Sequence, residues 1–561
     1  MKEKPKKLMN TIFLLLAINS VSMAKEVKEE NEFIILGTEY KMSDKNKKLK
    51  KLSNTNNEKP ENLSDDTEGS DEPSDDSAGT KDSDSETEKI TVIKENGVVK
   101  AEKTAFGSSL SYETTGNILG NDNTGLWAAD NNTSVANKYI IESYYTNNEA
   151  KNFSAEIVKN ANFINEGTIG GNRGGVLLQS GAVMSNEGTI NNTGDYGIYL
   201  EDSGTVLNNY SAGKIENYGN YGIFLNEGTK AENNGLIANR GKFGIYINNG
   251  EAVNSGVIEN NDDFGIYALG SESVIENNGT VKNTGNYGLY AGNEAKTANN
   301  AEGIIENTGD YGIYTEGNKS IAENFGIVSN EKAYGMIAKN GGTIVNTKNG
   351  IVNNGTDYGM YVDGTGSTAQ NNGKIKNDGN SGIHAVSGSE GINSETGIIQ
   401  NTGNVGMYSE SGSKTLNYGR IENSGLYGMF TADNSQGYNY GEIKNNSSNG
   451  AYVTGSGSVF INEETGIISN NGKDGIHISS SAEGINKGII ANNGTEGMYV
   501  ESQGQGRNVG EIRNTSDNGV YINGAGSRFV NEETGVISNA GTGGIYATFG
   551  GTVENKGVIS N

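Results

Sequence analysis

The chain of 561 residues has no cysteine, three prolines, two histidines and one tryptophan. The lack of cysteine excludes disulfides and lipid attachment at an N-terminal cysteine, and it suits a chain that crosses a second membrane unfolded. Acidic residues outnumber basic ones, and the net charge is −26. Nucleic acid and anionic lipid are therefore disfavoured as partners, because both attract clustered lysine and arginine. Only 33% of the residues are hydrophobic, which is less than an ordinary globular core requires.

Residues 1–24 have the layout of a secretory signal peptide. Four lysines lie among the first seven residues, an apolar run extends from Thr11 to Ile18, and the small residues Ser22 and Ala24 follow. The apolar run is too short to span a bilayer. We therefore expect export, with cleavage between Ala24 and Lys25.

Residues 25–88 are predicted to be a disordered acidic tether. Residues 61–88 contain twelve acidic residues, one lysine and no aromatic residue, so they cannot bury enough apolar surface to offset their chain entropy. Order is expected to begin near residue 89, where two apolar runs flank Asn96-Gly97 as in a β-hairpin. Residues 89–160 are therefore predicted to form an N-terminal cap.

From about residue 161 onwards the sequence repeats one unit. A phrase of the type Gly-Ile-Tyr, as at Gly244-Ile245-Tyr246, recurs 17 times between residues 175 and 546, with a mean spacing of about 23 residues. A second phrase, Asn-x-Gly-x-Ile-x-Asn, alternates with it, as in "NSGVIEN" at 254–260. A fixed period of this length is typical of a solenoid.

Within each unit, apolar residues alternate with others at a period of two, as in short strands with one inner face. Ile245 and Ile247 occupy such inner positions. Helical repeats would need longer stretches of 3.6-residue periodicity, and the repeats contain none. Two or three short strands per unit predict an all-β fold, a right-handed parallel β-helix (β-solenoid) of about 17 coils over residues 161–561.

Three residue types support this fold. All three prolines precede the repeats, as expected where strand N–H groups bond the adjacent coil. The recurrent asparagines are predicted to form ladders, each bonding its own turn and the asparagines of the coils above and below. The recurrent glycines allow positive φ at the corners of the coils.

The signal peptide, the acidic tether and the Asn-x-Gly-x-Ile and Tyr-Gly-Ile-Tyr repeats resemble the passenger region of type V autotransporters. They are most similar to the large adhesin-like passengers of fusobacteria and their relatives. The resemblance covers about residues 161–561 and implies passage through the periplasm to the surface of a Gram-negative cell. It also implies a C-terminal outer-membrane barrel of roughly 250–300 residues. The chain has no such segment, so we expect it to be truncated at its C-terminus.

No catalytic, cofactor-binding or metal site is predicted. His384 and His477 each take the place that other coils fill with tyrosine, and they lie four coils apart, so they cannot share one zinc ion or one triad. Asp262 and Asp263 resemble the carboxylate pairs of polysaccharide enzymes. Aspartate recurs at this corner in other coils, however, which is typical of turns.

The residue two positions after the opening glycine is aromatic in 13 of 17 coils and is predicted to point outward. These rings form a candidate binding stripe for a glycan or a partner surface, or they only stabilise the stacked coils. A second aromatic column precedes the glycine from Tyr196 to Tyr358 and then mostly lapses. The stripe consists of Tyr199, Phe224, Tyr246, Tyr267, Tyr290, Tyr314, Tyr361, Tyr408, Phe430, Tyr452, Tyr499, Tyr521 and Tyr546.

These observations predict an exported passenger that acts as a structural stalk and adhesin, without chemistry and without a cofactor. Its expected partners are receptors or glycans on host or bacterial surfaces. Two alternatives remain: a β-helix carbohydrate-active enzyme, and a protein whose coils self-associate along their tyrosine and asparagine faces. An enzyme should show one coil with a long loop and unique polar residues, whereas no long insertion breaks the period after Gly175.

Overall fold

The computed structural model describes residues 91–95, 98–102, 110–131, 133–146 and 152–561, all within one compact unit, Glu86–Asn561. The predicted signal peptide, with Ala24 and Lys25, and the predicted tether lie outside the described residues. Within the described part of the chain there are 61 strands and no helix. Accordingly, this part contains no helix long and apolar enough to cross a membrane.

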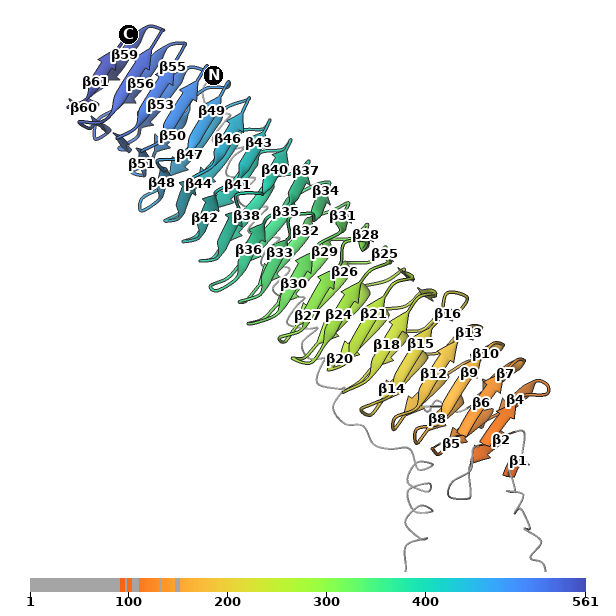
Figure 1. Cartoon of the computed structure of the whole chain (residues 1–561). Coiled ribbons are helices and arrows are strands. Elements are labelled where there is room, and N and C mark those ends of the chain that lie inside the picture. Colours follow the sequence, from red (N-terminus) through yellow and green to blue (C-terminus); the bar gives the residue numbers. More distant parts are fainter. Residues whose placement is uncertain (1–90, 96–97, 103–109, 132, 147–151) are drawn as a thin grey trace, which may run out of the picture. The chain divides into compact units, whose positions relative to one another are not determined.

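Each coil consists of three short strands joined by turns, and the coils stack in sequence order (Figure 1). One coil contains β20 (Phe243–Asn248), β21 (Glu251–Asn254) and β22 (Val257–Asn260), after which β23 (Phe264–Leu269) opens the next coil. Each strand pairs in parallel with its counterpart one coil further on, as β20 does with β23. The result is three parallel sheets, here called A, B and C in chain order, in about 19 coils of about 23 residues. The predicted parallel β-helix is confirmed.

The hydrophobic core lies inside the coils, between the three sheets. Ile245 and Ile266 pair one coil apart and are 1% and 0% exposed, as the alternation predicts. Sheets B and C contribute inward residues such as Ala252 and Ile258 of the same coil. These side chains belong to one continuous cluster that runs through the stacked coils. Because every coil adds the same layer, the core extends along the solenoid without a break.

Two asparagine ladders fix the register of the coils. At the end of each sheet B strand from β6 (Thr133–Asn137) to β60 (Thr552–Asn555), an asparagine Nδ2 bonds the Oδ1 of its counterpart in the neighbouring coil at 2.7–2.9 Å. A second ladder joins the sheet C ends between Asn192 and Asn561 at 2.8–3.4 Å. Buried amides require such partners. The predicted ladders are confirmed, at two corners of the coil.

The opening glycines are required by close approach between coils. A Cβ on Gly244 would lie 2.5 Å from the carbonyl oxygen of Gly265 and 2.8 Å from Cγ2 of Ile258. Positive φ occurs instead in the turn between sheets A and B, at 83° in Gly204 and 98° in Gly270. The expectation of positive φ therefore holds for turn glycines, and the opening glycines have a different role, because a side chain there would separate adjacent coils.

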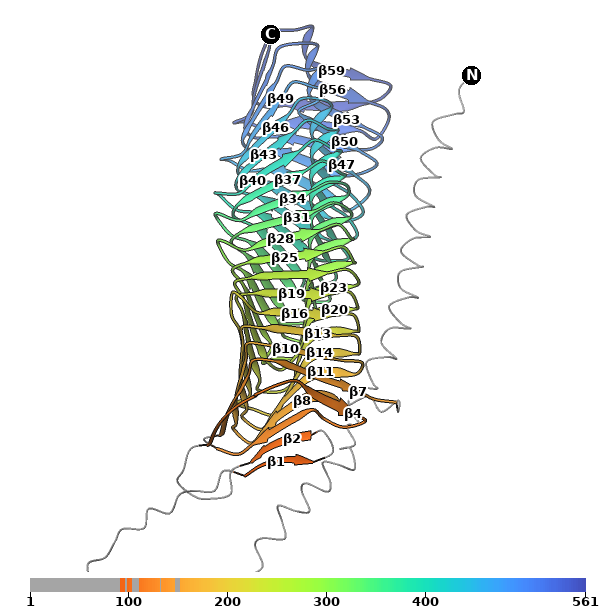
Figure 2. The same ribbon diagram turned by 90° about the vertical axis from the view of Figure 1, so that its right-hand side faces the viewer.

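The N-terminal hairpin predicted around Asn96-Gly97 is present. β1 (Thr91–Glu95) pairs antiparallel with β2 (Val98–Glu102), and β2 pairs in parallel with β5 (Leu126–Ala129) of the next coil. The sheets do not stop at the predicted boundary between cap and repeats, since β4 (Ile118–Asn121) already belongs to sheet C (Figure 2). Coil pairing needs only the inner apolar alternation, which begins before the Gly-Ile-Tyr phrase does.

Candidate functional site

The candidate binding stripe lies on the face of sheet A opposite to the core. Tyr246, Tyr267 and Tyr290 pair in register on successive coils. The ring centroids are 5.2 Å apart between Tyr246 and Tyr267 and 4.5 Å apart between Tyr267 and Tyr290, with the planes 21° and 15° from parallel. The ring faces therefore contact one another, and no ligand can stack on them there.

The second aromatic column packs beside the stripe and partly covers it. Phe264 meets the edge of Tyr267 at 4.7 Å and stacks on Tyr287 of the next coil at 4.5 Å. Tyr199, Tyr267 and Tyr314 are consequently only 5%, 7% and 8% exposed. Together the columns form a double aromatic ladder on sheet A. The second column comprises Tyr196, Tyr221, Phe243, Phe264, Tyr287, Tyr311, Tyr334 and Tyr358.

Beyond Tyr358 the second column holds only one ring, Tyr427, which lies 5.3 Å from Phe430 and 5.1 Å from Tyr452. Tyr408 stacks on Phe430 at 4.7 Å, and Tyr499 stacks on Tyr521 at 5.2 Å. These four rings are half-buried, so their outer edges are partly accessible. The second-column positions there hold Ser381, Val405, Tyr427, Asn449, Asp474, Glu496, Asn518 and Gly543.

A glutamate at the end of a sheet A strand bridges rings of two coils. Glu316 accepts hydrogen bonds at its Oε2 from the hydroxyls of Tyr314, in its own coil, and Tyr290, in the preceding coil, at 3.3 and 3.2 Å. We call this arrangement of two rings and one carboxylate a ring clamp. It ties neighbouring coils together on the outer face of sheet A.

The same clamp recurs with histidine in place of the first tyrosine. His384 Nε2 lies 3.1 Å from Glu410 Oε1, while the Tyr408 hydroxyl donates to the other oxygen of Glu410. Burial raises the pKa of Glu410, but the hydrogen bond and charge of His384 and the hydroxyl of Tyr408 outweigh it, and this pKa is lowered. Nδ1 of His384 is buried and has no hydrogen-bond partner among the described residues.

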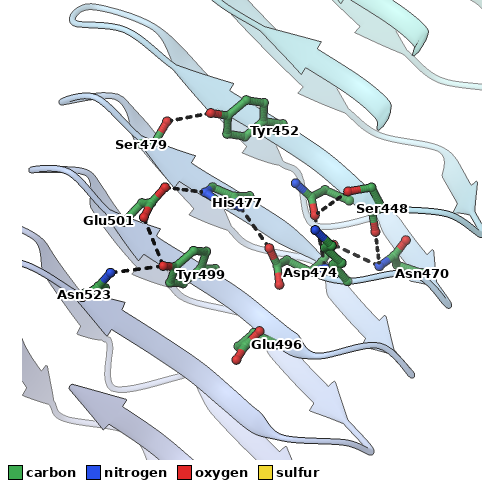
Figure 3. A network of polar contacts seen from close by, with 12 residues as sticks. Ser448, Tyr452, Asn470, Asp474, His477, Ser479, Glu496, Tyr499, Glu501 and Asn523 are labelled. Carbon is green, nitrogen blue, oxygen red and sulfur yellow. Dashed lines mark hydrogen bonds and ion pairs between the residues drawn. The ribbon is translucent and has the colours of Figure 1, made fainter. Parts of the chain in front are cut away.

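The clamp at His477, on β50 (Ile476–Ser479), has an additional carboxylate (Figure 3). Nε2 of His477 lies 3.3 Å from Glu501 Oε1, and the Tyr499 hydroxyl donates to the second oxygen of Glu501 at 3.0 Å. Nδ1 of His477 lies 3.0 Å from Oδ2 of Asp474, whose side chain is only 6% exposed. Both imidazole nitrogens therefore face a carboxylate.

Glu496, the first residue of β53 (Glu496–Glu501), adjoins this clamp. Its carboxyl is hydrogen-bonded to that of Asp474. Burial, followed by the hydrogen bond and the charge of Asp474, raises the pKa of Glu496 to about 8. A hydrogen bond between two carboxyl groups requires a proton on one of them. These two acids occupy the second-column positions that carry rings in the N-terminal coils.

The chemistry open to these groups is limited. Both nitrogens of His477 are already engaged, so neither is poised to take a proton from a substrate. Within the described residues there is no group of three or more histidines or acids suited to a metal ion. Asp263 accepts a hydrogen bond from Asn286 at 3.0 Å, and burial, followed by the charge of Asp262, raises the pKa of Asp263. The geometry assigns these residues to contacts between coils.

The sequence placed both histidines in the aromatic ladder but missed their carboxylate partners. Glu410 follows His384 by 26 residues and Glu501 follows His477 by 24. Each glutamate stands two residues after the stripe tyrosine of the next coil, in "MYSE" and "MYVE". Aligning the coils at this position would have revealed the clamps.

No protein-family model matches this chain, and no curated protein matches it. The similarity to autotransporter passengers therefore stays a prediction from the motifs of the sequence.

Proposed function

We propose that the chain is an exported surface protein whose solenoid serves as a stalk and whose C-terminal coils carry an adhesive face. The observation that carries the proposal is the open part of the aromatic stripe, from Tyr408 to Tyr546, on a regular sheet. Tyrosine and phenylalanine bring large contact area at low entropic cost. The partner is a glycan or receptor on a host or bacterial surface, and it is bound without being converted.

The position of the stripe on sheet A favours this function over a purely structural one. In the N-terminal coils a second aromatic column flanks the stripe at every position from Tyr196 to Tyr358 and buries rings such as Tyr267. In the C-terminal coils most of the flanking positions are polar, with Asn449 and Asn518 beside the rings. An aromatic edge flanked by amides offers both apolar contact and hydrogen bonds to a partner.

The test is binding of the purified chain to cells and to immobilised glycans after replacing Phe430, Tyr452, Tyr521 and Tyr546 together with serine. Each exposed ring is expected to contribute about 0.5–1.5 kcal/mol, so binding should fall strongly. The matched control replaces Glu259, Lys282 and Glu306 on the outer face of sheet C with serine, and it should bind like the native chain.

Two results would contradict the proposal. If the folded stripe variant binds as strongly as the native chain, the stripe is not the adhesive face. Cleavage of a polysaccharide by the purified chain would instead support the alternative of a carbohydrate-active enzyme.

A further inference from the structure

We propose that Asp474, His477, Glu496 and Glu501 form a pH-sensitive fastening, which joins neighbouring coils while it holds its protons and loosens as the pH rises. This inference is independent of the proposed adhesive function. The fastening lies on sheet A, between β50 and β53, where the second aromatic column is absent (Figure 3).

The geometry at His477 offers an acceptor to each of two imidazole N–H groups. Its ring nitrogens lie 3.0 Å from an oxygen of Asp474 and 3.3 Å from an oxygen of Glu501. A neutral imidazole has one N–H and donates to only one of these carboxylates, whereas the imidazolium donates to both. Asp474 also contacts the preceding coil, since its backbone N–H donates to the side-chain oxygen Oδ1 of Asn449 at 3.3 Å. The cluster therefore spans three coils.

His384 provides the contrast within the same molecule. Its Nε2 faces Glu410, but its Nδ1 is buried and meets no hydrogen-bond partner in the described part of the chain. A second proton on His384 would leave a buried N–H without an acceptor, which is unfavourable. His384 thus has an acceptor for one ring N–H group, whereas His477 has a carboxylate for each of two.

The groups that face the cluster determine whether a rise in pH strengthens or weakens the contact between the coils. The rings of Tyr452 and Tyr499 lie against His477 from the two adjacent strands, and its other neighbours are Asp474 and Glu501. Without a second proton on His477 and the proton shared by Asp474 and Glu496, the cluster would hold three carboxylates and no cation.

Glu496 has further neighbours on its other side. These are the amide of Asn518 on β56 (Asn518–Asn523), which bonds it, and the charge of Asp517, which opposes its ionisation. The pKa of Glu496 is raised to about 8 by burial and then by Asp474, which also predicts that the fastening loosens as the pH rises. A carboxyl group with a raised pKa makes its full contribution to the free energy of unfolding below the ordinary carboxyl pKa. This contribution is lost as the pH rises through about 8.

The decisive measurement is the nitrogen spectrum of the full chain labelled with ¹⁵N only at histidine. The chain has two histidines, and His384→Tyr and His477→Tyr, each of which restores the residue common at this position, assign the signals. We expect His477 to keep protons on both ring nitrogens up to a higher pH than His384 does, because only His477 has a carboxylate at each nitrogen. Loss of the second proton from both histidines at the same pH would overturn the proposal.

Amide hydrogen exchange tests the loosening itself. After correction for intrinsic exchange, protection in residues 474–501 should fall between pH 6.5 and 9 by up to about tenfold per pH unit for each proton involved, relative to residues 243–260. Glu496→Gln should make this fall shallower, whereas the control Glu316→Gln, in the all-tyrosine clamp, should leave it unchanged. A pH response that is equal in both segments would refute the fastening. The histidine spectrum of the unsubstituted chain decides the matter if a variant does not fold.

Discussion

The coils around residues 196–361 and those around residues 405–546 share their interior and differ on one outer face. In both regions the inner apolar ladders, the two asparagine ladders and the opening glycines are the same. On the outside of sheet A, the first region carries two interlocked aromatic columns, and the second carries one column flanked mostly by polar residues. The inner positions are constrained by stacking, so differences in function are concentrated on the outer face.

The largest effect is expected from a charge in the shared core. Ile245→Asp in the first region and Ile522→Asp in the second should each destabilise by about 3–5 kcal/mol, because both leave a carboxylate buried without a partner. Ile245 and Ile522 are 1% and 0% exposed. The midpoint of denaturant unfolding measures the loss. A tolerated aspartate at only one of the two sites would show that the interiors differ after all.

Removing a stripe ring should destabilise the chain more in the first region than in the second. Tyr267 packs against Tyr246, Tyr290 and Phe264, whereas the ring of Tyr521 stacks on stripe rings, has no second-column ring beside it and is half-buried. We expect Tyr267→Ala to cost about 3 kcal/mol and Tyr521→Ala about 1 kcal/mol. Chemical denaturation followed by circular dichroism gives both values. Equal losses would mean that the second column adds little.

The asparagine ladder should be equally important in both regions. Asn254 and Asn486 are each buried and bonded to the asparagines of the two adjacent coils. Substituting either with alanine leaves the neighbouring amide without a partner, so we expect a loss of about 1–3 kcal/mol at both sites. Thermal melting of the two variants provides the comparison, and a clear difference between them would contradict a uniform ladder.

A smaller, pH-dependent effect is expected at the Glu410 clamp. The pKa of Glu410 is lowered in the folded chain, chiefly because His384 and Tyr408 outweigh burial. Its stabilising contribution is therefore present above the ordinary carboxyl value and is lost as the pH falls through the lowered one. Melting temperatures between pH 6 and pH 3 should fall less steeply in Glu410→Gln than in the native chain. An unchanged slope would show that Glu410 does not contribute to the acid response.

Much of the fold follows from local patterns that a single sequence displays. The alternation around Ile245 and Ile247 identifies the inner face, because successive side chains of a strand point to opposite sides. The recurrence of asparagine and glycine at one period identifies the ladders and the stacking of coils. The hairpin at Asn96-Gly97 follows from the preference of this dipeptide for tight turns.

Other properties depend on which residues the coils bring together. The covering of Tyr267 by Phe264, and the pairing of His477 with Asp474 and Glu501, join side chains across the sheet surface. The close approach of Gly244 to Gly265 likewise exists only once the coils are stacked.

The sequence by itself therefore determined the repeat, the inner face and the asparagine ladders of this protein, since these depend on spacing along the chain. The tertiary structure alone decided which rings are covered, which carboxylates meet the histidines and why the opening residue must be glycine. Those outcomes depend on the few ångströms between neighbouring coils, where burial and charge pairing act between residues more than 20 positions apart.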